Sequence, residues 1–129
     1  MGMNSFGALT TKVAIAPQSI TNAATTTGIE LDLAGAEGDI LFTGLYGSLS
    51  GSDATFTWKL TECAATGGTF TDVASGTFAT VGTFASDNLS VNFVAQSRAL
   101  MRFVKVVCTS TGTTTSLIGA VAAYRLKTA

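Results

Sequence analysis

The residues of this chain that could do chemistry are few, and they are mostly carboxylates. Glu30 and Asp32 stand two apart in "GIELDL", a spacing that places both on one face of a β-strand, where paired carboxylates can act in glycoside hydrolysis. The same spacing is that of a solvated strand face, which is the interpretation we adopt. The chain contains no histidine, so the usual general base, the commonest metal ligand and the Ser-His-Asp arrangement are missing. We therefore expect no enzyme activity.

The remaining candidate groups predict neither a metal nor a cofactor. Glu37 and Asp39 flank a glycine and Asp53 lies in "GSLSGSD", but their spacing matches no calcium-binding loop. Ser50 lies between glycines in "GSLSG", yet no helix follows it and no histidine can activate it. Cys63 and Cys108 are too few for a disulfide framework and are expected as buried thiols, although the sequence leaves open whether they are bridged.

Composition places the chain among protein-binding rather than nucleic-acid-binding or membrane proteins. Its 129 residues allow one domain, 47% of them are hydrophobic, and only 12% are charged, roughly half the usual fraction. The net charge of −1 provides no basic field for nucleic acid, and no apolar run approaches the roughly twenty residues of a membrane-spanning helix. No signal peptide is expected in "MGMNSFGALTTKVAIAP".

The pattern of short β-branched and aromatic runs, separated by Gly, Ser, Asn and Asp, predicts an all-β domain. We expect an antiparallel β-sandwich or a small, jelly-roll-like barrel over residues 11–129, preceded by an extended N-terminal arm over residues 1–10. The predicted strands are Lys12–Ala16, Ile29–Leu33, Ile40–Leu45, Ala54–Cys63, Thr69–Val73, Leu89–Val94, Leu100–Thr109 and Ser116–Leu126.

Three of these strands alternate cleanly between apolar and polar residues. The side chains expected to point inward are Phe56, Trp58 and Leu60, then Ile29, Leu31 and Leu33, then Leu89, Val91 and Phe93. Such alternation is typical of an antiparallel sheet with one face in water.

The segment "RFVKVVCTSTGTTTSLIGAVAAY", Arg102–Tyr124, breaks the pattern. It reads as a hairpin of two strands joined by a Thr- and Gly-rich turn, with apolar residues on both faces. Double-sided burial in a small antiparallel protein needs a second layer, and another subunit would supply one. We therefore predict an interface here and along the arm. Its candidate residues are Phe6, Leu9, Arg102, Lys105, Leu117, Val121 and Tyr124.

Three segments in order carry a resemblance to a known family: Thr25–Gly47, Ala54–Ala74 with its "FTDV", and Arg98–Tyr124 with "RFVKV…TSTGT…GAV". Together they resemble small virion structural proteins from the head gene clusters of tailed bacteriophages. The family's acidic turn is replaced here by Cys63–Gly68.

The resemblance implies a non-catalytic virion protein, most specifically a capsid decoration (cement) protein on the outer surface of a phage head, made in the host cytoplasm. Its expected partners are the major capsid protein and its own copies, as a homotrimer or another small ring, with no nucleic acid and no membrane. The alternatives are another virion component, such as a head–tail or tail protein or a spike base, and a free ligand- or carbohydrate-binding β-sandwich.

Overall fold

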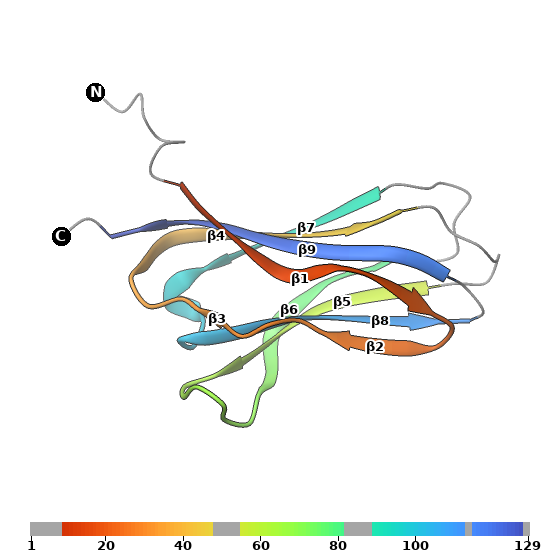
Figure 1. Cartoon of the computed structure of the whole chain (residues 1–129). Helices are drawn as coiled ribbons and strands as arrows, with labels where there is room; N and C mark the ends of the chain where they lie inside the picture. The colour runs from red at the N-terminus through yellow and green to blue at the C-terminus, as the bar shows by residue number, and fades with distance from the viewer. Residues whose placement is uncertain (1–8, 48–54, 82–88, 113–114, 128–129) are drawn as a thin grey trace.

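The computed structural model describes residues 9–47, 55–81, 89–112 and 115–127, and these form nine strands and one short 3₁₀ helix (Figure 1). The elements are β1 (Leu9–Thr21), β2 (Ala24–Thr27), β3 (Leu31–Asp32), β4 (Ala36–Tyr46), β5 (Thr55–Cys63), β6 (Thr71–Val81), β7 (Leu89–Gln96), η1 (Ser97–Ala99), β8 (Phe103–Thr111) and β9 (Thr115–Leu126).

The strands form two antiparallel sheets stacked as two layers (Figure 1). Sheet A has the order β1-β9-β4-β7; sheet B has the order β2-β8-β5-β6, with β3 also pairing with β8. This arrangement confirms the predicted all-β, antiparallel sandwich. The sheets are linked along one side, where Gly28 N donates to Val106 O of β8 and Ile29 N donates to Ala14 O of β1.

The core lies between the sheets and is built from the inward-facing residues that alternation predicts in β5 and β7. Phe56, Trp58 and Leu60 are fully buried, and Val91 and Phe93 pack against the same cluster. A glycine of sheet A receives the tryptophan: a Cβ on Gly44 would lie only 2.7 Å from Trp58 Cε3. The indole therefore packs directly against the β4 backbone and joins the two layers.

The structure contradicts the predicted hairpin of Arg102–Tyr124. Its first strand, β8, lies in sheet B between β2 and β5, and its second, β9, lies in sheet A between β1 and β4. The segment between them therefore crosses from one sheet to the other. Turn residues indicate where the chain reverses, but not whether the flanking strands pair, and sequential strands are neighbours only about two-thirds of the time.

The segment around Ile29 also differs from its prediction. Leu31 and Leu33 are buried as expected, but Ile29 is 55% exposed and β3 covers only Leu31–Asp32. Here the chain passes between the sheets, and the backbone of Gly28 packs so closely against Ala14 O that an added Cβ would overlap it. The inward and outward alternation restarts after this point.

Other boundaries shift as well. Strand β2 was not predicted, β6 extends well past Val73, and β8 begins three residues late because η1 precedes it. Strand β1 begins at Leu9, and Leu9 and Thr10 pair with Arg125 and Tyr124 of β9. Residues 1–8 of the predicted arm lie outside the described residues.

Candidate interaction face on sheet A

The two faces of β9 have opposite environments. Ile118, Ala120 and Ala122 point into the core, whereas Leu117 and Val121 point away from it and are exposed. Both sets are apolar, but among the described residues only the first set is covered. The unusual composition that the sequence shows in this strand therefore belongs to an uncovered surface.

The exposed apolar residues of β9 have apolar neighbours on the other strands of sheet A, with Thr43 and Asn92 between them. In register, Val121 lies opposite Val13 of β1, and Leu41 of β4 lies opposite Val94 of β7. Side chains of directly opposed residues share one side of a sheet. We name this outer surface the aliphatic face. It comprises Leu9, Val13, Leu41, Leu45, Val94, Leu117 and Val121, which are 37% to 63% exposed.

The aliphatic face concentrates the exposed apolar surface of the domain. It holds seven of the ten large hydrophobic residues that are exposed in the described part of the chain. Scattered exposed apolar residues are normal, but a contiguous patch is typical of a protein–protein contact. This face is therefore the candidate functional site.

The aliphatic face has a shallow hollow at Gly119 of β9, with a volume of about 490 Å³. Pro17 of β1, Leu45 of β4 and Leu117 stand around it. The β1 strand has register shifts between Val13 and Gln18, and this irregularity brings Pro17 over the glycine. The aliphatic face is therefore not flat, and its hollow is mostly apolar.

One end of the face carries charge. Arg125 of β9 is in register with Glu37 of β4, and Asp39 follows two residues later at the start of the same strand. All three are exposed, and none forms an ion pair with another described residue. Glu37 and Asp39 also line the groove at the η1 end, together with Arg98 and Lys127. At the opposite end, the described residues around Ser19, Leu117 and Ser90 carry no charge.

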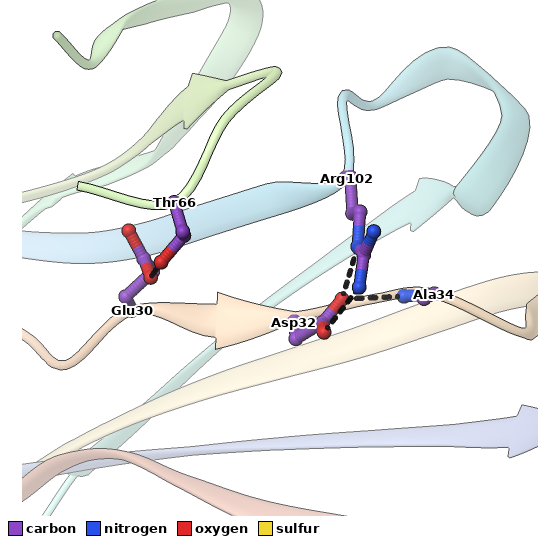
Figure 2. Close-up of polar contacts among 5 residues, drawn as sticks. All are labelled: Glu30, Asp32, Ala34, Thr66 and Arg102. Carbon is purple, nitrogen blue, oxygen red and sulfur yellow. Dashed lines mark hydrogen bonds and ion pairs between the residues drawn. The ribbon is translucent and has the colours of Figure 1, made fainter. Parts of the chain in front are cut away.

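Sheet B has its own cover. The loop between β5 and β6 lies over the outer side of β8, where Lys105 Nζ is 4.3 Å from the centroid of the Phe70 ring. The loop is held by Glu30, whose carboxylate accepts hydrogen bonds from Thr66 Oγ1 at 2.6 Å and from Gly67 N at 2.9 Å (Figure 2 shows the Thr66 bond). These two bonds lower the pKa of Glu30. Val107 and Phe103, also on the outer side of β8, are buried, and the guanidinium of Arg102 lies 5.0 Å from the centroid of the Phe103 ring.

Asp32 fixes the neighbouring part of the chain. Its carboxylate accepts hydrogen bonds from Arg102 Nε at 2.9 Å and Nη2 at 3.0 Å, and from Ala34 N at 3.0 Å (Figure 2). The paired guanidinium, followed by the backbone bond, lowers the pKa of Asp32 to about 2. Glu30 and Asp32 therefore hold loops by hydrogen bonds and an ion pair. They do not face each other across a cleft as a catalytic pair would.

The structure separates the predicted interface residues into three groups. Leu9, Leu117 and Val121 lie together on the aliphatic face. Arg102 and Lys105 belong to sheet B, where Arg102 pairs with Asp32 and Lys105 stacks on Phe70. Tyr124 is only 2% exposed and packs in the core, and Phe6 lies outside the described residues.

The sequence did not identify Val13, Leu41, Leu45 and Val94 as members of one surface. The available signal was in "ILFTGLYG", which has large residues on both sides. Only the strand order of sheet A shows that these residues lie beside Leu117 and Val121.

The described residues contain neither a metal-binding cluster nor a membrane-spanning helix. Across the described ranges, no group of three or more His, Cys, Asp or Glu side chains is placed to hold a metal ion. Cys63 and Cys108 are free and buried, and burial raises the pKa of the Cys108 thiol to about 12. None of the helical structure in the described residues is long and apolar enough to cross a bilayer.

Known proteins share the fold rather than the sequence. Neither a scan against protein families nor a search of curated proteins gives a match. Among solved structures, a chain of the T13 particle of infectious bursal disease virus matches 92% of this chain with a TM-score of 0.64 at 13% identity, over 31% of its own length. The D431N mutant of protein VP2 from the same virus, in derived T=1 particles, matches with a TM-score of 0.62 at 12% identity, over 92% of this chain and 31% of VP2.

A second kind of neighbour is enzymatic and modular. The CBM22-1–GH10 modules of xylanase 10B from Clostridium thermocellum, complexed with xylohexaose, match 96% of this chain and 27% of their own with a TM-score of 0.52 at 8% identity. The chain thus spans about a third or less of each of these neighbours. At these identities, the likeness defines a β-sandwich domain of a kind found in viral capsid proteins and in carbohydrate-active enzymes.

Proposed function

We propose that this protein is a structural component of a virion, and most specifically a capsid decoration protein on the outer surface of a phage head. In this role it stabilises the shell by bridging major capsid subunits and carries out no catalysis. The single observation that carries the proposal is the aliphatic face, an apolar surface that the described residues leave uncovered. A protein with such a surface is built for an assembly.

One comparison with solved structures and one resemblance in the sequence support the virion over other assemblies. The fold is shared with chains of infectious bursal disease virus particles. The ordered segments Thr25–Gly47, Ala54–Ala74 and Arg98–Tyr124 resemble phage head proteins in sequence. The two lines of support are independent, because one rests on backbone geometry and the other on residue types.

The mechanism is burial of apolar surface, multiplied over many copies. Fully burying a Leu or Val side chain contributes about 1.5–3 kcal/mol. The seven residues of the aliphatic face are each partly exposed, so a contact that covers them contributes several kcal/mol before the entropy cost of association. Repetition around a shell converts such contacts into strong attachment through avidity. Oligomer contacts and shell contacts therefore act together.

Within the same class, a head–tail protein, a tail protein or a spike base would use the same physics at another place in the virion. A carbohydrate-binding module is the alternative from a different class, supported by the likeness to the xylanase modules. Sugar-binding sites are typically lined by aromatic side chains. In the described residues, the exposed apolar surface is aliphatic throughout, and the groove of about 590 Å³ at the η1 end has no aromatic residue in its lining. These features favour a protein partner.

The test is co-sedimentation with purified phage heads that lack the protein, followed by thermal challenge of the loaded heads. We expect saturable binding and a higher temperature of shell disruption. Ile29→Asp, a charge outside sheet A, is the matched control for Val121→Asp on the aliphatic face, and only the second is expected to bind poorly. Absence of binding to heads, together with specific retention of the protein on a glycan column, would instead establish the carbohydrate-binding alternative.

A further inference from the structure

We infer that the aliphatic face is covered by the same face of a second copy of this chain, related by a two-fold axis that runs along the strands between β9 and β4. The inference rests on the proposed function and deepens it: the aliphatic face joins two copies, and the pair attaches to the shell more strongly than a single chain would. These two strands are the central pair of sheet A, so the axis places β9 of one copy over β4 of the other and β1 over β7. A two-fold contact of this kind requires one surface to be complementary to itself.

The central strands meet that requirement in shape. On the outer side, β9 carries the small residues Gly119 and Ala123, and their register partners on β4 are the large residues Leu45 and Leu41. The axis exchanges the two strands and keeps each residue at the same height along the strand direction. Leu45 of each copy therefore faces Gly119 of the other, and Leu41 of each copy faces Ala123 of the other.

The hollow at Gly119 is the clearest case. Gly119 forms its floor, and Pro17 and Leu117 form part of its wall. Leu45 is the register partner of Gly119, so in the pair Leu45 of one copy enters the hollow of the other. Within one copy the hollow remains open, and its apolar lining is what such a side chain requires.

The charged end is complementary under the same axis. Arg125 lies on β9, while Glu37 and Asp39 lie on β4, and none of the three is ion-paired among the residues that the structure describes. Exchange of β9 and β4 brings Arg125 of each copy to the acidic pair of the other. Charge complementarity fixes orientation and discriminates against wrong arrangements.

The alternative face-to-face arrangement has its two-fold axis across the strands. It would place Arg125, Glu37 and Asp39 over the opposite end near Leu117 and Ser19, where the described residues carry no charge. Charges covered by apolar surface without a partner are strongly disfavoured. The charge pattern therefore selects the axis along the strands.

The size of sheet A fits a stable contact. Four strands spaced about 4.8 Å apart, and about 35 Å long, cover about 700 Å². Specific protein–protein interfaces bury roughly 800 Å² on each partner. One face of sheet A is thus close to the area that a stable pair needs.

The experiment uses charge reversal in the full chain, with mass determined by native mass spectrometry and sedimentation velocity. Wild type is expected to form a dimer. Arg125→Glu alone and the double variant Glu37→Arg with Asp39→Arg alone should each weaken self-association at least tenfold, because like charges then meet. Mixed in equal amounts, the two variants should form a mixed dimer at wild-type affinity, because both charged contacts are then complementary. A purely intrachain role for these residues would not restore association on mixing.

Three results would overturn the inference: a monomeric wild type at tens of micromolar, a wild-type trimer, or variants that fail to pair when mixed.

A second variant tests the hollow. A Cβ on Gly119 would meet its nearest atom, Ile15 O, at 3.5 Å, so the fold accepts a small side chain there. Gly119→Val should keep the wild-type circular dichroism spectrum but weaken the dimer at least tenfold, with Gly119→Ala between; an unchanged dimer would also overturn the inference. Head binding is measured separately, so failure of pairing and failure of the virion role are distinguishable.

Discussion

Replacement of Val121 by aspartate should separate assembly from folding. Val121 lies in the middle of β9, opposite Val13 and Thr43 on the neighbouring strands, and its side chain is 37% exposed on the aliphatic face. In the isolated domain, the carboxylate can point into water. The folding cost is then limited to strand propensity and lost contacts, about 1 kcal/mol.

The cost to association is larger. Each copy loses the burial of a partly exposed valine, about 1 kcal/mol, and buries a carboxylate without a partner, which costs about 1–3 kcal/mol or more. In a two-fold pair both terms occur twice, so the total is about 4–8 kcal/mol. The dissociation constant should therefore rise by roughly a thousandfold or more.

Sedimentation velocity across a concentration series measures this rise, and a urea titration followed by circular dichroism measures the folding cost. Ile29→Asp is the control, because it adds the same charge at an exposed apolar residue outside sheet A. We expect the control to associate like wild type. A Val121→Asp variant that stays fully associated would refute the assignment of this face as an interface. A variant that unfolds would show that Val121 contributes to folding far more than its exposure implies.

Three further outcomes follow from the described contacts. Gly44→Ala should lower the free energy of unfolding by about 1–3 kcal/mol, because the new Cβ would lie 2.7 Å from Trp58 Cε3. Thermal unfolding measures the effect, and an unchanged midpoint would show that the indole has room to move. Asp32→Asn should be less stable than wild type at pH 7, because pairing with Arg102 lowers the folded pKa of Asp32 to about 2. The difference should shrink as the pH falls from about 5 and disappear near pH 1; a difference in urea midpoint as large at pH 2 as at pH 7 would contradict this. Cys108 should resist a thiol reagent at pH 8 until the protein unfolds, because burial raises the pKa of its thiol to about 12. Peptide mapping after treatment of the native protein locates the label, and a label on Cys108 would contradict this prediction.

The sequence predicted the parts of this fold that are encoded locally. The alternation in "ATFTWKL" identified the inward face of β5, and Val91 and Phe93 were placed correctly in β7. Such patterns are readable because a strand buried on one face must alternate with period two. The all-β class and the two-layer arrangement follow from several such strands separated by turns.

The failures come from contacts between residues far apart in the sequence. The Thr- and Gly-rich turn after Thr109 reads like a hairpin, yet β8 and β9 lie in different sheets because each strand pairs with more distant neighbours. Ile29 was misplaced at the point where Gly28 packs against Ala14 across the sheet junction. Tyr124 was assigned to the interface although it faces the core, because both sides of β9 are apolar and the sequence does not say which is covered.

The two sheets differ in how the apolar outer sides of β8 and β9 are covered. Sheet B covers the apolar outer side of β8 with its own loop, held in place by the hydrogen bonds of Glu30 to Thr66 and Gly67. Double-sided burial in β8 thus needs no second subunit, contrary to the expectation for the whole segment. Over sheet A, the described residues provide no such cover, and the uncovered surface is both aliphatic and patterned, with small residues on β9 beside large ones on β4. One two-fold axis would bring Leu45 of each copy to Gly119 of the other and Arg125 of each copy to Glu37 of the other, so a single arrangement satisfies both ends of the surface.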